Sequence, residues 1–245
     1  MTTPLLDVRG LSVEFPLRRR RLQALDGISF MLEAGDVLGF VGESGAGKSL
    51  TGAAIMGLLE PPGRITAGTI ALQGRRIEDD AASVRGGEIG MIFQDPLTSL
   101  NPLRTVGDQL VETIQLHLGL SGDAAEARAI ELLEEVGIDP ERRGAFPHEF
   151  SGGMRQRIVI ALALAPEPKL IIADEPTTAL DVSIQAQVLV LLRRLCKERG
   201  AAVILITHDM GVIAETTDRV AVLYAGRLVE EGPTSNVIAA PRHPY

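Results

Sequence analysis

The 245-residue sequence has few aromatic residues, a single cysteine and no long apolar run. It contains no tryptophan, two tyrosines and six phenylalanines, so its core must be built from aliphatic side chains. Cys196 has no second cysteine to pair with, which excludes an internal disulfide and favours a reducing compartment. The longest apolar run, Ile158–Ala165, is far shorter than the roughly 20 residues of a membrane-spanning helix. We therefore expect no transmembrane segment, and the first ten residues lack the pattern of a signal peptide.

The charge balance is acidic, with 24 lysines and arginines against 32 aspartates and glutamates and a formal net charge of −8. This balance argues against nucleic acid as the main partner. Hydrophobic residues make up 45% and charged residues 23% of the chain, which excludes a disordered or fibrous protein. At this length, one large α/β domain with an elaboration fits as well as two small domains.

Four consecutive arginines, Arg18–Arg21, stand out against the acidic balance. They lie between two segments that alternate or cluster apolar residues like strands, Leu5–Phe15 and Ile28–Gly35. A basic run in this position is either a solvated hairpin loop or a contact for phosphate or an anionic lipid headgroup. The pattern leaves both interpretations open.

The hydrophobic pattern changes twice along the chain. Further strands are expected at Asp36–Gly42, 65–74 and Glu88–Pro96. Helices are expected at Thr105–Leu118, Asp123–Val136 with Asp123 as the N-cap, and Gly153–Ala165. Beyond these, strands at Lys169–Asp174, Ala201–Thr207 and Arg219–Gly226 alternate with helices at Ser183–Arg199 and Gly211–Thr217. This alternation is typical of a parallel sheet, so we predict an α/β core (about 1–96 and 161–245) with an antiparallel N-terminal portion and a helical insert at about 97–160.

Residues 42–49, GESGAGKS, match the phosphate-binding pattern G-x-x-x-x-G-K-[ST] at every fixed position. The glycines let backbone N–H groups turn inward around an anion, and the following helix adds its positive N-terminal end. Lys48 is expected to reach the β- and γ-phosphates, and the Ser49 hydroxyl to ligate Mg²⁺. The sequence therefore predicts a nucleoside triphosphate site formed by Gly42, Glu43, Ser44, Gly45, Ala46, Gly47, Lys48, Ser49 and Leu50.

Two adjacent carboxylates, Asp174 and Glu175, end the apolar run LIIA. A carboxylate at the carboxyl end of a parallel strand beside a phosphate loop is placed to hold Mg²⁺, which is the role predicted for Asp174. Glu175 is predicted to polarise the water that attacks the γ-phosphate. The alternative is an acidic N-cap for the turn at residues 176–178.

Ser151, Gly152 and Gly153 predict a second helix start able to bind an anion, because serine is a good N-cap and the glycines leave backbone amides bare. With this segment the chain resembles the nucleotide-binding subunits of ABC transporters. FSGGMRQR (Phe150–Arg157) matches their signature motif, LIIADEP their Walker B segment and ALD (Ala179–Asp181) their D-loop. Gln94 stands at the Q-loop position and His208 at the switch-histidine position.

The resemblance implies a P-loop NTPase (RecA-like) fold and two subunits paired head to tail around ATP. Ser151, Gly152, Gly153 and Gln156 would then face the γ-phosphate held by the partner's Lys48, and Asp181 would cross the interface. The implied roles of the remaining residues are a γ-phosphate and metal contact for Gln94, orientation of water for His208 and adenine stacking for Phe15. Each of these residues also has a plainer interpretation when it is taken alone. Gln94 would be a turn residue and His208 a histidine with ordinary hydrogen bonds. Asp181 would be a helix cap, and Phe15 a strand aromatic packed inward.

Segments 93–107 and 148–157 resemble the di- and oligopeptide (and nickel) importer branch of that family. The resemblance implies an ATPase at the cytoplasmic face of the membrane that powers peptide import through a separate permease, together with an extracytoplasmic substrate-binding protein. The alternatives are an importer of nickel or another small solute and, less favoured, a soluble ABC ATPase without a transport role. Members of that branch continue past the RHPY at residues 242–245, often into a cysteine-rich iron–sulfur segment, so a truncated chain or half of a fused pair is expected. Phe93, Phe146, Phe150 and Cys196 are expected to pack in the core.

Overall fold

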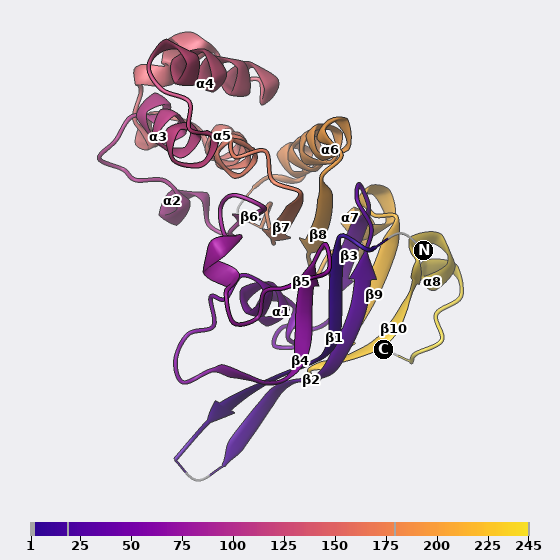
Figure 1. Ribbon diagram of the computed structural model, residues 1–245. Coiled ribbons are helices and arrows are strands. Elements are labelled where there is room, and N and C mark those ends of the chain that lie inside the picture. The colour runs from indigo at the N-terminus through magenta and orange to yellow at the C-terminus, as the bar shows by residue number, and fades with distance from the viewer. Residues whose placement is uncertain (1–2, 19, 179, 245) are drawn as a thin grey trace. The chain divides into compact units, whose positions relative to one another are not determined.

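The computed structural model describes residues 3–18, 20–178 and 180–244. The chain forms two compact units, which are described separately: unit 1 comprises Met1–Arg85 and Gly200–Tyr245, and unit 2 comprises Gly86–Arg199 (Figure 1). No helix in the described ranges is long and apolar enough to cross a membrane. Ala179 of the predicted D-loop and Arg19 of the arginine run lie outside the described residues.

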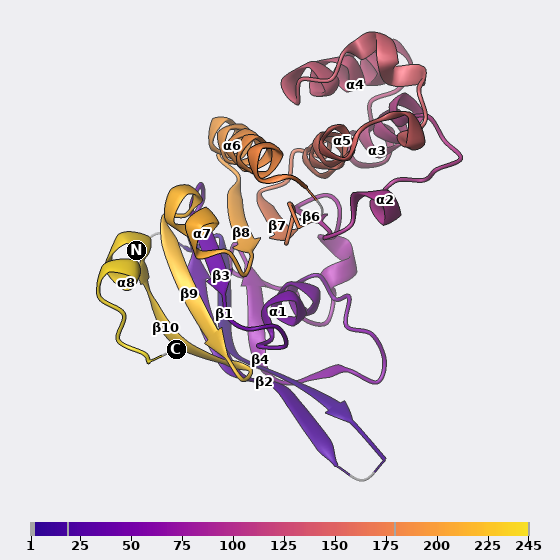
Figure 2. The ribbon, with the colours of Figure 1, turned by 180° about the vertical axis from the view of Figure 1, so that it is seen from behind.

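Unit 1 begins with an antiparallel sheet of strand order β2-β1-β4-β5. Its strands are β1 (Leu6–Pro16), β2 (Arg21–Leu32), β4 (Arg64–Leu72) and β5 (Arg75–Arg76). The strand predicted at Leu5–Phe15 is confirmed, whereas β2 begins seven residues before the predicted Ile28, because its ladder with β1 continues to Phe15↔Leu22 and Pro16↔Arg21. The β1–β2 hairpin thereby projects beyond the rest of unit 1 (Figures 1 and 2).

The parallel strands of unit 1 centre on β3 (Val37–Val41), which pairs with β8 (Ala202–Ile206) on one side and β9 (Arg219–Tyr224) on the other. All five residues of β3 and all five of β8 are buried, as expected for aliphatic strands covered on both faces. The helices of this unit are α1 (Lys48–Ile55), α7 (Met210–Thr216) and α8 (Thr234–Ala239), with a 3₁₀ turn at Ala81–Ser83.

The antiparallel strand β10 (Arg227–Pro233), which pairs with β9, and helix α8 were not predicted. Five consecutive residues of β10 are half-buried, so the strand lacks the alternation by which sequence patterns reveal a strand. Helix α8 is six residues long, too short to show a helical period. Figure 2 shows α8 following directly on β10.

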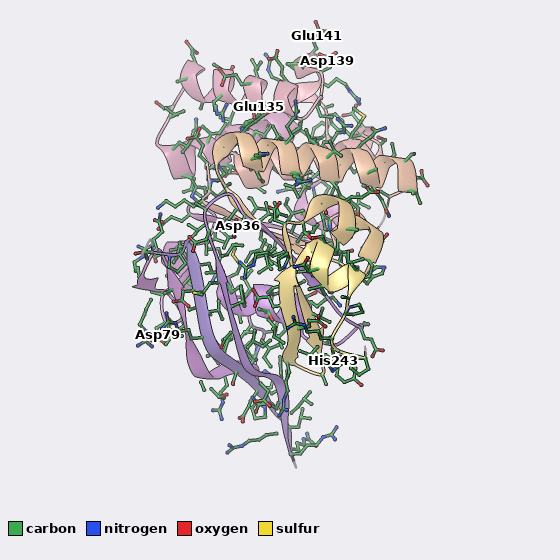
Figure 3. All side chains as sticks on the ribbon, turned by 90° about the vertical axis from the view of Figure 1, so that its right-hand side faces the viewer. Asp36, Asp79, Glu135, Asp139, Glu141 and His243 are labelled. Atoms are coloured by element: carbon green, nitrogen blue, oxygen red, sulfur yellow. The ribbon has the colours of Figure 1, made fainter. Side chains whose placement is uncertain are left out.

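Unit 2 pairs β6 (Ile89–Ile92) in parallel with β7 (Leu170–Asp174). Its helices are α2 (Pro96–Ser99), α3 (Val106–Leu118), α4 (Asp123–Glu135), α5 (Gly152–Leu164) and α6 (Val182–Arg199), with 3₁₀ turns at Pro140–Gly144 and Pro147–Glu149. Helices α3, α4 and α5 contact one another, and each carries buried aliphatic side chains, such as Leu110, Leu133 and Ile158. Glu135 at the end of α4, labelled in Figure 3, forms ion pairs with Arg128 and with Arg199 of α6.

Two local predictions for unit 2 are wrong. Strand β6 ends at Ile92 rather than near Pro96, because Asp95 caps α2 by accepting a hydrogen bond from the Leu97 N–H at 2.8 Å. Asp123 is the first residue of α4 and not its N-cap, which is Gly122 with φ of 54°. The helices predicted between 97 and 160 are present, but unit 2 also contains β6, β7 and α6, so the boundaries of a separate insert stay a prediction.

Among the residues expected to pack, Phe150 is 2% exposed and lies under the Arg142 guanidinium, at 4.3 Å from its ring centroid. Cys196 is also buried in α6, so its expected place in the core is confirmed, and this burial raises the pKa of its thiol to about 12. Phe93 and Phe146 are instead 45% and 37% exposed. The expectation that these two phenylalanines are core residues is wrong.

Candidate nucleotide site

The loop at residues 42–49 connects β3 to α1, as the phosphate-binding pattern requires. Gly47 precedes the helix with φ of 103°, a conformation that favours glycine. Gly42 has φ of 153°, and a Cβ added there would lie 2.2 Å from the carbonyl oxygen of Leu223. Both glycines are therefore needed to bring the loop back to the helix start.

Lys48 is buried beneath the phosphate loop, with only 6% of the residue exposed. Its Nζ donates hydrogen bonds to the carbonyl oxygens of Gly42 at 2.8 Å and Glu43 at 2.9 Å. These bonds fix the ammonium inside the curve of the loop, where it can meet an incoming phosphate.

The other residues of the predicted site differ in their exposure to solvent. Glu43, Ser44, Gly45 and Ser49 are exposed, Leu50 is half-buried, and Ala46 is packed inward. Exposed loop amides, a helix N-terminus, one cation and one hydroxyl form a donor set that fits a triphosphate with its metal.

His208 follows β8 in unit 1, and the segments on either side of it are held by hydrogen bonds. The Asp209 N–H donates to Thr207 Oγ1 at 3.1 Å, and Asp209 Oδ1 caps α7 by accepting from the Gly211 N–H at 2.7 Å. His208 itself is exposed and lines a cavity of about 340 Å³ together with Gly42. The structure thus places the predicted switch histidine and the first phosphate-loop glycine around one space.

In unit 2 the structure brings Gln94 and Glu175 into direct contact, although they are 81 positions apart. Gln94 Nε2 donates a hydrogen bond to Glu175 Oε2 at 2.9 Å. Thr178 Oγ1 donates to the same carboxylate oxygen, also at 2.9 Å. Glu175 lies directly after Asp174, the last residue of β7, and both residues are half-buried.

Glu175 has a φ of 44°, in the left-handed region that non-glycine residues rarely adopt. Holding a glutamate there costs on the order of 1–3 kcal/mol, and such strain concentrates at functional sites. Thr178 was not predicted as a site residue. Its place three residues after Glu175, a spacing that suits a turn, is the signal that could have found it.

The second predicted anion site, at the start of α5, has the expected local structure. Ser151 is the N-cap with φ of −66° and ψ of 164°, and its Oγ accepts a hydrogen bond from the Met154 N–H at 3.4 Å. Ser151 and Gly152 are exposed, while Gly153 lies so close to α6 that an added Cβ would be 2.6 Å from Ile184 Cγ2. The start of α5 is therefore exposed at Ser151 and Gly152 and packed against α6 at Gly153.

Gln156 differs from the prediction that groups it with these exposed residues. Its side chain is buried, at 1% exposure, and its Nε2 has no hydrogen-bond partner within the described part of the chain. Gln156 lies one turn into α5 on the side that faces the core of unit 2. In this structure the side chain is not presented to a ligand at the helix start.

Asp181 lies directly before α6, and Phe15 lies near the end of β1. Asp181 is exposed, and its carbonyl oxygen accepts the first hydrogen bonds of α6, from the N–H groups of Ile184 and Gln185 at 2.9 Å each. Phe15 is half-buried near the end of β1, and a Cβ added to Gly63 would lie 2.7 Å from its ring.

A β3–loop–α1 unit with a buried lysine, on a parallel sheet, defines a P-loop nucleoside triphosphatase. The family model described as "ABC transporter" matches residues 25–178. The chain therefore belongs to the ABC transporter ATP-binding family, as the motifs predicted. Members of this class are ATPases, and this chain is an ATPase of the ATP-binding cassette type.

Curated relatives and solved structures agree with this assignment. The oligopeptide transport ATP-binding protein OppD of Bacillus subtilis (strain 168) is 54% identical over 250 residues, which cover 99% of this chain and 70% of that protein. The dipeptide transport ATP-binding protein DppD of Escherichia coli (strain K12) is 48% identical over 247 residues, covering 98% and 76%. A dimeric ATP-binding cassette in a post-hydrolysis state with ADP and Pi superposes with a TM-score of 0.82 at 27% identity, covering 94% of this chain and 98% of that one.

Proposed function

We propose that this chain hydrolyses ATP to power the import of di- or oligopeptides through a separate membrane permease. The observation that carries the catalytic part is the Glu175 carboxylate, held on a strained backbone between Gln94 and Thr178. The peptide cargo rests on relatives named for oligopeptide and dipeptide transport.

Each predicted residue has a part in this reaction. Lys48 and the loop amides bind the β- and γ-phosphates, and Ser49, Asp174 and Gln94 supply oxygen ligands suited to Mg²⁺. The metal would neutralise charge on the phosphates. Glu175 accepts a proton from the attacking water, and the Gln94 and Thr178 donors fix the orientation of its carboxylate. His208 orients the water and the γ-phosphate, and the Phe15 ring stacks on adenine.

The active unit in this proposal is a pair of subunits. Ser151 and Gly152 are exposed at the start of α5, and Arg155, one turn on, donates hydrogen bonds from Nε to the carbonyl oxygen of Pro147 at 2.8 Å and from Nη2 to that of His148 at 3.2 Å. This helix start therefore offers half of an anion site and needs a ligand held by another chain. Asp181 would lie at the same interface. The partner subunit is either a copy of this chain or a paralogue.

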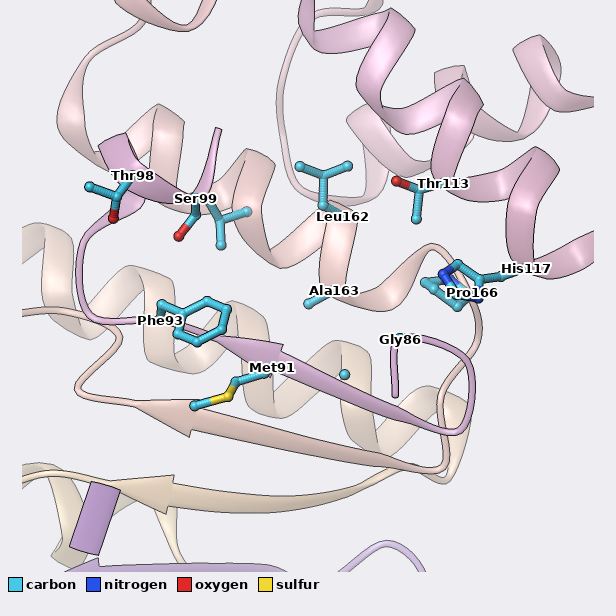
Figure 4. A pocket seen from close by; sticks show the side chains of 12 residues that line it. Gly86, Met91, Phe93, Thr98, Ser99, Thr113, His117, Leu162, Ala163 and Pro166 are labelled. Carbon is cyan, nitrogen blue, oxygen red and sulfur yellow. The ribbon is translucent and has the colours of Figure 1, made fainter. Parts of the chain in front are cut away.

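A groove in unit 2 is suited to bind a helix of the permease. It has a volume of about 540 Å³, and Figure 4 shows Met91 and Phe93 on one side of it and Leu162 on the other. Thr98 and Ser99 at its edge both donate their hydroxyl hydrogens to the Asp95 carbonyl oxygen, at 3.1 and 2.9 Å, so these two groups have no donor left for an occupant. The groove thus favours an apolar side chain from its occupant.

Such an occupant would act on the catalytic site through the chain itself. Phe93, which lines the groove, immediately precedes Gln94, which holds Glu175. Movement of the permease helix would displace Phe93, and because Gln94 is the next residue, it would also displace the hydrogen-bond donor to the Glu175 carboxylate. In this arrangement the chain lies at the cytoplasmic face of the membrane, and peptides come from an extracytoplasmic substrate-binding protein.

The test is co-purification of the chain with its permease from native membranes, followed by ATPase assays with candidate peptides. We expect a permease to be recovered and peptides to stimulate hydrolysis, whereas stimulation by nickel alone would identify a metal importer. Phe93→Asp should abolish permease recovery while leaving ATP affinity unchanged. Leu103→Asp, at a residue 86% exposed outside the groove, is the matched control and should retain the permease. Failure of the unaltered chain to recover any permease would contradict the transport role.

A further inference from the structure

The projecting end of the β1–β2 hairpin concentrates positive charge that the ATPase reaction does not use. Arg18, Arg20 and Arg21 are all exposed there. The turn between the strands is closed by a hydrogen bond from the Leu17 N–H to the Arg20 carbonyl oxygen at 2.8 Å. We call Leu17, Arg18, Arg20, Arg21 and Leu22 the arginine tip. It lies in a chain whose formal net charge is −8.

The cations of the arginine tip differ from other arginines of the protein in their partners. Elsewhere in unit 1, Arg76 pairs with Glu78, Arg219 with Glu231, and Arg227 with Asp26. No ion pair among the described residues involves Arg18, Arg20 or Arg21. Adjacent like charges repel one another, so this cluster is at its most favourable when an anionic surface lies against it.

Two leucines flank these cations and are exposed as well. Leu17 is 46% exposed and Leu22 is 48% exposed. Basic side chains mixed with apolar ones suit the boundary between anionic headgroups and acyl chains, where the cations meet phosphate and the apolar groups leave water. A nucleic acid would use the cations but gain nothing from the leucines, and the acidic balance of the whole chain opposes it.

We infer that the arginine tip binds the headgroups of an anionic lipid bilayer and gives the chain a direct hold on the membrane, in addition to any permease. The hairpin shape supports this inference, because it carries the tip beyond the remainder of unit 1 (Figures 1 and 2). The inference rests on the proposed membrane location only for its biological setting. Its test uses lipid alone and no permease.

The experiment is co-sedimentation of the full chain with vesicles of phosphatidylglycerol and phosphatidylcholine, compared with vesicles of phosphatidylcholine alone. We expect binding to the anionic vesicles that falls as salt is added, because screening weakens the attraction. Each arginine near an anionic surface strengthens partitioning by about fivefold, so the triple substitution Arg18→Ser, Arg20→Ser and Arg21→Ser should weaken it by about a hundredfold.

Matched controls separate local from overall charge. Substituting Arg143, Lys197 and Arg242 with serine changes the net charge by the same amount at exposed positions elsewhere, and it should leave vesicle binding within about twofold. Leu17→Ser should weaken partitioning by about tenfold because its apolar area no longer leaves water. Leu116→Ser, at a residue 75% exposed in α3, should have no effect.

Three results would overturn the inference: no binding of the unaltered chain to anionic vesicles, equal loss in the two triple variants, or preferential binding of the tip to a single-stranded oligonucleotide over vesicles. A result of this kind leaves the proposed function intact. The arginine-tip variant should still co-purify with the permease, so the two proposals fail independently.

Discussion

The starts of α1 and α5 use the same backbone device, a turn containing glycines that leads into a helix, but they are completed differently. At α1 the Lys48 ammonium is enclosed by the carbonyl oxygens of its own loop, so backbone and cation are supplied together. At α5, Ser151 and Gly152 are exposed, and the nearby cation, Arg155, donates its hydrogen bond to the carbonyl oxygen of Pro147, which lies outside the helix start. In the proposed function, the start of α1 is therefore a whole phosphate site and the start of α5 is half of one.

Loss of the proposed catalytic base should reduce hydrolysis more than any change at the two helix starts. Glu175→Gln should lower turnover by about 10²–10⁴-fold while ATP affinity is retained, because the amide cannot accept the proton of the attacking water. Steady-state phosphate release and nucleotide titration measure the two properties. Glu167→Gln is the control, since Glu167 also has a positive φ, of 56°, but is outside the catalytic contacts. Unchanged turnover in Glu175→Gln would remove the proposed role.

Lys48 at the start of α1 and Arg155 in the first turns of α5 should differ in their effect on ATP binding. Lys48→Ala should weaken ATP binding to the isolated chain by roughly 10–100-fold, because a charge-assisted hydrogen bond to phosphate is lost. Arg155→Ala should leave that affinity within about twofold and instead lower the melting temperature, because two carbonyl oxygens lose their donor. Equal losses of affinity in the two variants would mean that the two helix starts are equivalent.

A substitution at the start of α5 can disturb the proposed anion site there while Lys48 stays unchanged. Gly153→Ala should lower turnover by roughly tenfold, because its Cβ must displace Ile184 and shift the first turn of α5. ATP affinity of the isolated chain should not change. Gly144→Ala is the matched control, since a Cβ there meets nothing within 4 Å. A loss of ATP affinity in Gly153→Ala would show that α5 contacts nucleotide in its own chain.

The smallest effect is expected from the proposed adenine contact. Phe15→Ala should weaken ATP binding by about fivefold, at the lower end of the range for stacking on a base, and should affect GTP similarly because stacking tolerates any base. Phe146→Ala, at an aromatic residue 37% exposed, is the control. An unchanged affinity in Phe15→Ala would favour the plainer interpretation, a strand aromatic packed against Gly63.

Local patterns predicted the parts of the fold and site that are continuous in sequence. The phosphate loop could be identified because its residues adjoin one another, and the buried strands β3 and β8 because their aliphatic runs are uninterrupted. The contact between Gln94 and Glu175 could be expected only through the family resemblance, since 81 positions separate them and no local rule joins them. Strand β10 was missed because its residues are half-buried without alternation.

For two residues, the sequence motif did not predict the direction in which the side chain points. Gln156 belongs to the signature segment by position, but helical geometry turns its side chain into the core of unit 2. Phe93 is expected from the sequence to pack in the core, yet it lines the groove that we propose for the permease. In both cases the side to which a residue points, which depends on tertiary packing, decides its role.

In the proposed function, each ATP lies between the phosphate loop of one chain and the α5 start of another. Once the unaltered chain alone has been shown to hydrolyse ATP as a pair of copies, two inactive variants, Lys48→Ala and Ser151→Arg, are mixed and hydrolysis is measured. A mixed pair retains one site with an intact Lys48 and an intact Ser151, so random mixing should restore about a quarter of the unaltered activity. If the α5 start serves the nucleotide of its own chain, every site in the mixture is defective. Mixing would then restore no activity, and the claim would be contradicted.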